Sequence, residues 1–328
     1  MSRKALVVGI NYYKDKAINP LLGCVNDAKG VKSVLDRHGD GSKNFEVKLK
    51  VASNKNNTIK RKTLKNEVKI LFKDDNEIAL FYFSGHGHID SMGSYLMTSD
   101  CKDGDDGLSM SELLTIVNGS NAKNKIIVLD CCYSGEFGNV SRTAYNNALT
   151  IVSNSLLSEG TTILTASGKD ECAVENNGAG LFTTLFIDAM NGSASDLMGN
   201  ITPGSIYAHI DQFFGLWKQR PIFKANVKKF ATLRKMQPQI PIDDLKKLVK
   251  LFHSKSESFK LDPTYEPKSE CPNKNNVKKF ELLKKYNKKN LVVPVDAEDM
   301  YSAAIKSKSC KLTIYGQDYW SLIKEERI

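Results

Sequence analysis

The segments IALFYFSGHG, at residues 78–87, and KIIVLDCCYSG, at residues 125–135, decide the fold of this chain. Each begins with a continuous apolar run, which is typical of a strand buried on both faces of a parallel sheet. Each run then passes into polar and glycine residues, where a strand is expected to end. Because ligands of such sheets bind outside the carboxyl ends of the strands, His86 and Cys132 are predicted to lie together at a functional edge.

The sequence around these two segments alternates strand and helix patterns. This alternation predicts an α/β fold with a mainly parallel sheet and helices on both faces. The predicted strands are residues 5–10, 45–51, 78–83, 125–129 and 161–166, and the predicted helices are residues 27–38, 58–73, 111–117, 181–190 and 203–214.

A proline-containing stretch at residues 236–242 is typical of a linker and predicts two domains, residues 1–236 and 237–328. The second is expected to be a small α+β module. Its predicted helices are residues 243–252, 277–286, 297–305 and 319–326, its strands are 291–295 and 311–315, and a long loop is expected at 254–276.

The composition is that of an ordinary globular protein. Hydrophobic residues make up 41% and charged residues 26% of the 328 residues, which excludes a disordered chain, a collagen-like fibre and a disulfide miniprotein. There is no apolar run long enough to span a bilayer and no signal-peptide pattern at the start, so no membrane is expected. Seven cysteines without a CxxC pair favour a reducing compartment, and we expect a soluble, cytoplasmic protein.

The net charge of +10 is concentrated in two clusters, at residues 218–235 and 274–289. Such clusters can bind nucleic acid or another anion, but they are more often solvated surfaces. Neither a GxGxxG motif nor a P-loop follows a predicted strand, so a nucleic-acid or nucleotide-binding sheet is disfavoured.

A cysteine nucleophile requires a nearby base and donors for an oxyanion. His86 and Cys132 fit the first requirement, and the backbone N–H groups of Gly87 and Cys132 are candidates for the second. Taken singly, His86 at a strand end and Cys132 as a buried core thiol are ordinary structural residues. Their occurrence together, in glycine-rich frames after successive core strands, favours a catalytic dyad.

The motifs FYFSGHG and DCCYSG resemble those of the caspase-like cysteine peptidases, in the metacaspase and bacterial caspase-homologue branch. The resemblance covers roughly residues 1–235 and includes further matching motifs at residues 9–13, 23–28, 165–167 and 180–183. It implies a caspase-fold endopeptidase with His86 as base and Cys132 as nucleophile.

The resemblance also implies a pocket for the residue before the cut, lined by Cys24, Asp27, Ser84 and Asp130. Two carboxylates there favour Arg or Lys, because a carboxylate–guanidinium contact is strong and directional. An alternative role for Asp27 is that of a helix cap or first-turn acid, and the two roles are compatible.

The chain departs from the family pattern at two places. Tyr133 follows the nucleophile position where the family has His, and Met110-Ser111 replaces a usual pair of aspartates before Glu112. An acidic stretch that in the family serves activating calcium is therefore more simply explained as a solvated loop, so no metal is expected and calcium dependence is doubtful. The stretch contains Asp100, Asp103, Asp105 and Asp106.

The sequence suggests two hypotheses about regulation. Arg142 lies in the segment 136–160, which is often cleavable in the family, and it suits self-cleavage. The second module, with Tyr286, the lysines of 284–289 and the aromatic residues of 315–320, is a candidate site for a small anionic or nucleotide activator, or for a partner. By analogy, the whole chain resembles a latent effector of bacterial defence or cell death, with a catalytically silent scaffold or signal-binding protein as the alternative.

Overall fold

The computed structural model describes residues 2–133, 156–166, 180–214 and 221–328, with Cys132, Tyr133 and Phe214 described by their backbone alone. The chain divides into two compact units, residues 1–237 and 238–328. Arg142 lies outside the described residues.

An eight-stranded sheet forms the centre of the first unit, with the strand order β2-β1-β3-β6-β7-β9. The strands from β2 to β7 run parallel, whereas β9 is antiparallel to β7, and β4 and β5 extend the sheet beyond β3 in antiparallel pairing. The strands are β1 (Arg3–Ile10), β2 (Glu46–Ala52), β3 (Ile78–Ile89), β4 (Ser94–Leu96), β5 (Leu108–Ser109), β6 (Asn124–Tyr133), β7 (Thr161–Thr165) and β9 (Ile222–Asn226).

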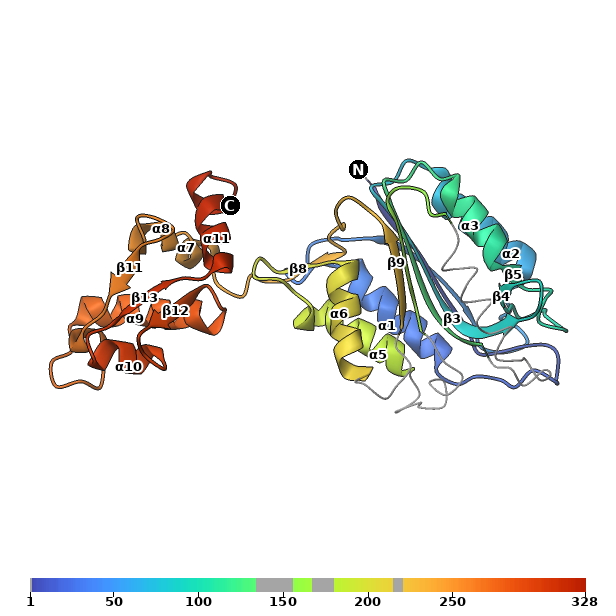
Figure 1. Ribbon diagram of the computed structural model, residues 1–328. Helices are drawn as coiled ribbons and strands as arrows, with labels where there is room; N and C mark the ends of the chain where they lie inside the picture. The colour runs from blue at the N-terminus through green and yellow to red at the C-terminus, as the bar shows by residue number, and fades with distance from the viewer. Residues whose placement is uncertain (1, 134–155, 167–179, 215–220) are drawn as a thin grey trace. The chain divides into compact units, whose positions relative to one another are not determined.

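Helices cover both faces of this sheet, which confirms the predicted fold class. α1 (Cys24–Asp36), α5 (Leu181–Asp188) and α6 (Pro203–Phe214) lie on one face, and α2 (Arg61–Lys73) and α3 (Met110–Asn118) lie on the other (Figure 1). A short π-helix, Ala189–Ser193, follows α5, and a two-stranded sheet joins β8 (Asn200–Ile201) to β10 (Arg234–Lys235).

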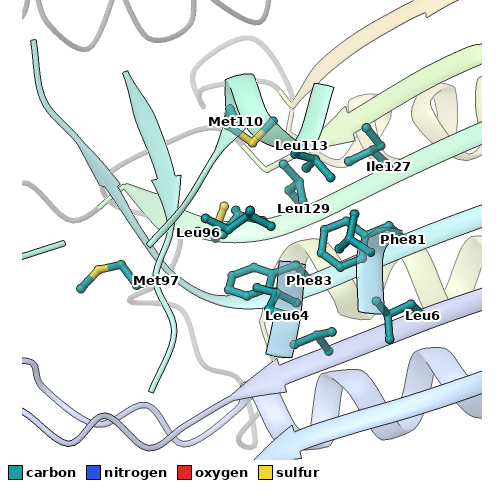
Figure 2. Close-up of a cluster of buried hydrophobic side chains, with 14 of the residues drawn as sticks. Leu6, Leu64, Phe81, Phe83, Leu96, Met97, Met110, Leu113, Ile127 and Leu129 are labelled. Atoms are coloured by element: carbon teal, nitrogen blue, oxygen red, sulfur yellow. The ribbon is translucent and has the colours of Figure 1, made fainter. Parts of the chain in front are cut away.

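The buried side chains form two cores, one on each face of the sheet. Because alternate strand residues point to opposite faces, Phe81 and Phe83 of β3 enter the core beneath α2 and α3, while Leu80 and Tyr82 enter the core beneath α1 and α5. Figure 2 shows the first of these cores, with Leu64 of α2 packed near the phenylalanines. This division decides which residues of β3 and β6 can contribute to a site on the α1 side.

Strands β3 and β6 are longer than the sequence predicted. Each strand continues beyond its apolar run into the glycine-rich or polar motif that follows. His86 and Cys132 therefore lie on strand extensions and not in loops. Antiparallel pairing of Gly87 with Leu96 in β4 supports the extension of β3. The prediction ended the strands where hydrophobicity ended, but backbone pairing does not require apolar side chains.

The second unit is a three-stranded antiparallel sheet with helices, which agrees with the predicted α+β module. Its strands are β11 (Ser258–Lys260), β12 (Val292–Val295) and β13 (Ser309–Leu312), and its helices are α7 (Ile242–Leu245), α8 (Leu248–Leu251), α9 (Lys274–Lys288), α10 (Met300–Ile305) and α11 (Ile314–Lys324), with a 3₁₀ turn at Pro263–Tyr265.

Three predictions for this unit were wrong in detail. The single helix at 243–252 is two helices separated by a turn, and the loop at 254–276 contains β11. The strand predicted at 311–315 ends at Leu312. The next residue, Thr313, is the N-cap of α11, because its hydroxyl accepts a hydrogen bond from the Gly316 N–H. Among the described residues, no helix is both long and apolar enough to span a bilayer.

Candidate active site at the carboxyl edge of the sheet

His86 is held by the loop that follows β1. Its backbone N–H donates to the hydroxyl of buried Tyr13 over 2.8 Å, and its ring Nε2 lies 2.8 Å from the backbone oxygen of Asn19. A backbone carbonyl can only accept, so Nε2 carries the proton in this hydrogen bond. In the neutral imidazole, Nδ1 is then the nitrogen that can accept a proton. The loop therefore sets both the orientation and the tautomer of the ring.

Cys132 is the direct neighbour of His86 in the sheet. The register of β3 and β6 pairs Ser84 with Asp130 and His86 with Cys132. Neighbouring strands lie about 4.8 Å apart, so the backbones at these two positions are adjacent. The preceding cysteine, Cys131, is buried in the core beneath α2 and α3. The side chain of Cys131 is thus part of a core, whereas the backbone of Cys132 lies beside that of His86.

Asp27 lies in the first turn of α1 and is buried. One carboxylate oxygen accepts the Ser84 hydroxyl over 3.2 Å, and the other accepts the Gly180 N–H over 3.1 Å. A first-turn carboxylate is also favoured by the helix dipole. Asp27 is therefore both a first-turn acid and a member of the predicted cluster. Cys24 begins the same helix and is buried there.

Asp130 accepts a hydrogen bond from the Thr183 hydroxyl over 2.5 Å, and the Thr183 oxygen in turn lies 2.5 Å from the hydroxyl of buried Tyr82. Because the Thr183 proton points to the carboxylate, Tyr82 is the donor in the second bond. Burial of the carboxyl group raises the pKa of Asp130 to about 6, while hydrogen bonds from Thr183 act in the opposite direction. The pKa of Asp130 is thus well above that of an ordinary aspartate.

Gly180 lies close to both carboxylates. A methyl group on Gly180 would lie 2.8 Å from Oδ2 of Asp130 and 3.5 Å from Oδ2 of Asp27. The φ of −69° at this residue is open to any amino acid, so the requirement for glycine is one of space. A larger residue at this position would therefore crowd the carboxylate of Asp130.

The chain matches the caspase-domain family of peptidases over residues 2–248. It belongs to that family. The Metacaspase-1 of Meyerozyma guilliermondii is 39% identical over 90 residues, which are 26% of this chain and 22% of that protein. The Metacaspase-1 of Debaryomyces hansenii is 37% identical over 92 residues, which are 26% of this chain and 20% of that protein. The chain thus covers about a fifth of the curated relatives that it matches.

A solved structure shares the fold of this caspase-domain protein. Protein GSU0716 from Geobacter sulfurreducens aligns with a TM-score of 0.52 and 15% identity, covering 73% of this chain and 98% of that one. At this identity the likeness concerns the fold alone. The family match and the metacaspase relatives confirm the resemblance that the sequence motifs indicated.

Two of the four aspartates in the acidic stretch of this caspase-domain protein, and the nearby Glu112, are engaged in protein contacts. Asp100 accepts the N–H of Arg61 over 2.9 Å, and Asp106 accepts the N–H of Lys102 over 2.9 Å. Glu112 pairs with Arg61 over 2.6 Å and with Lys65 over 2.5 Å. Within the described ranges, no three acidic, His or Cys side chains gather as a metal site would require. These contacts favour a structural role for the stretch.

The structure adds residues that sequence reasoning did not assign to the caspase-domain site. Thr183 and Gly180 belong to a recognised motif, but their contacts with Asp130 and Asp27 follow only from the placement of α5. Tyr13 and Asn19, which hold His86, lie in a loop whose path the sequence does not predict. Cys24, Asp27, Ser84 and Asp130 all lie at this edge on the α1 side.

Proposed function

We propose that the chain is a cysteine endopeptidase that cleaves after Arg or Lys with a dyad of His86 and Cys132. The register pairing of these two residues carries the proposal. Family membership supports peptidase chemistry, and the fixed tautomer of His86 supports its use as a base.

In the proposed mechanism, Nδ1 of His86 takes the proton of Cys132, and the thiolate attacks the carbonyl carbon of the scissile peptide bond. Backbone N–H groups of Gly87 and Cys132 stabilise the oxyanion that forms. His86 then returns the proton to the leaving amine, and an acyl-enzyme remains on Cys132. A water molecule, deprotonated by His86, hydrolyses this thioester and restores the free thiol.

The two carboxylates support the proposed specificity. Asp27 and Asp130 both lie close to Gly180, and a guanidinium or ammonium group that reached the two carboxylates would gain two charge-assisted hydrogen bonds. An aspartate side chain would meet like charge instead. The proposed partners are therefore protein substrates whose basic residue at the cut binds between these two carboxylates.

The test is turnover of fluorogenic peptides that end in Arg, Lys or Asp, with Cys132→Ala as the matched control. We expect turnover of the Arg and Lys peptides, and its loss in the variant. Because Met110-Ser111 stands where the family has a pair of aspartates, we expect turnover to be equal in calcium and in EDTA. Turnover of the Asp peptide would contradict the acidic pocket, and equal turnover in Cys132→Ala would contradict the dyad.

Absence of turnover under every condition would favour the second candidate, a caspase-fold scaffold. The proposed setting, a latent cytoplasmic effector of defence or cell death, rests on analogy with family members that carry appended modules. A gain in turnover after addition of an anionic activator would support latency, and full activity of the untreated protein would count against it.

A further inference from the structure

The second unit contains a groove of about 490 Å³ whose walls carry lysines from two segments. Lys278, Lys279 and Lys285 of α9 form one wall, and Lys247 and Lys250 of the α7–α8 segment contribute to the other. On α9, positions 278 and 285 are seven residues apart and thus share a helix face. Lysines distant in sequence therefore converge on one space.

The positive charge of this lysine groove is only partly compensated. The carboxylate of Asp244 is shared by Lys247, at 2.7 Å, and Lys285, at 3.4 Å, and the hydrogen bond from Lys247 lowers the pKa of Asp244. A single carboxylate cannot neutralise two ammonium groups. The groove contains one further carboxylate, that of Glu281, against three further lysines. Over the described ranges, no ion pair is formed by Lys250, Lys278 or Lys279. Their mutual repulsion favours an anion between them.

The other residues singled out in this module have structural roles. Tyr286 is fully buried and donates its hydroxyl to the backbone oxygen of Asp244, so its ring is not available to a ligand. Lys284 lies over the ring of Phe280 and reaches Glu266 at 3.8 Å. Trp320 donates its indole N–H to the backbone oxygen of Phe252 over 2.7 Å. The combination of aromatic stacking and positive charge that the sequence suggested around Tyr286 is not formed.

We propose that the lysine groove binds an oligophosphate chain. Its volume lies within the ~300–1,000 Å³ of typical small-ligand sites. Lysine ammonium groups act as point charges for phosphate and impose little orientation, which suits a flexible chain of several phosphates. Recognition is therefore by charge along the chain rather than by a base, and the phosphates of a nucleotide or of free polyphosphate meet the same lysines.

The test is calorimetric titration of the full-length Cys132→Ala protein with tripolyphosphate, ATP and adenosine, in about 0.15 M salt. The groove variant carries Lys250→Gln, Lys278→Gln and Lys279→Gln. The matched control carries Lys306→Gln, Lys308→Gln and Lys311→Gln, which remove the same charge from exposed positions of the same unit. Thermal melting checks that each variant is folded, and Lys278→Gln alone serves if the triple variant is not.

We expect tripolyphosphate and ATP to bind and adenosine not to bind. The groove variant should lose roughly tenfold in affinity, since each exposed ammonium group contributes modestly, and the control should stay within about twofold of the parent. Equal losses in both variants, binding of ATP without tripolyphosphate, or tight binding of duplex DNA alone would overturn the proposal. Binding is measured without turnover, so the result is independent of the proposed peptidase activity.

Discussion

At the scale of single residues, the protonation of Asp130 should control recognition of a basic ligand. Burial raises the pKa of this carboxyl group from 3.8 to about 6, so at pH 5 it is mostly neutral and at pH 7 mostly charged. Benzamidine, a cationic mimic of arginine, should therefore bind the Cys132→Ala protein about tenfold more tightly at pH 7 than at pH 5. Titration calorimetry across this range measures the midpoint, and Asp130→Asn should abolish the dependence. An unchanged affinity would remove Asp130 from the pocket.

Thr183 is a positioning residue for the same carboxylate. Thr183→Val keeps the side-chain shape but removes the hydroxyl donated to Asp130, so the pKa of Asp130 and the benzamidine midpoint should move upward. The variant should also lose about 1–3 kcal/mol of unfolding free energy, because the buried hydroxyl of Tyr82 loses its acceptor. The matched control is Tyr82→Phe, which should leave the midpoint almost unchanged. A midpoint that fails to move in Thr183→Val would contradict this role.

At the scale of elements, the period of the apolar residues predicted most helices and strands but not what happens at their ends. The helix expected at 58–73 begins at Arg61, because the backbone N–H and C=O groups of Ile59 bond to Ser99 instead. Strand β9, at the edge of the sheet, was not predicted, because it lies in a segment rich in lysine. Local pattern fixes the interior of an element, whereas partners distant in sequence fix its boundaries.

Gly180, the residue immediately before α5, should determine how much space the proposed acidic pocket offers to a basic side chain. Gly180→Ala places a methyl group 2.8 Å from Asp130, although the backbone there tolerates alanine. We expect KM for an Arg peptide to rise at least about fivefold, with little change in melting temperature. The matched control is Gly119→Ala at the end of α3, where the nearest atom lies at 3.4 Å. A KM that is equal in both variants would show that the pocket lies elsewhere.

At the scale of the whole molecule, the site is assembled from segments that are far apart in sequence. The hydrogen bond between Asp27 and Gly180 spans 153 residues, and that between Thr183 and Asp130 spans 53. The motifs indicated the candidate site residues, and the parallel sheet indicated the edge where they lie. The hydrogen bonds of Thr183 and Gly180 could not be predicted, because they depend on how α5 packs over the carboxyl ends of β3 and β6.

This assembly bears on the proposed self-cleavage after Arg142. The cut would separate β6 from β7, yet the two strands pair from Lys125 with Thr161 to Leu129 with Thr165, and their side chains share the core beneath α5. The fragments 1–142 and 143–328 should therefore elute together on gel filtration and separate only in denaturant. Mass spectrometry of the active protein should show both fragments, and Cys132→Ala and Arg142→Gln should each stay intact. An intact mass for the active protein would contradict the cut. Fragments that separate without denaturant would mean that the paired strands and the shared core do not hold the two halves of the site together.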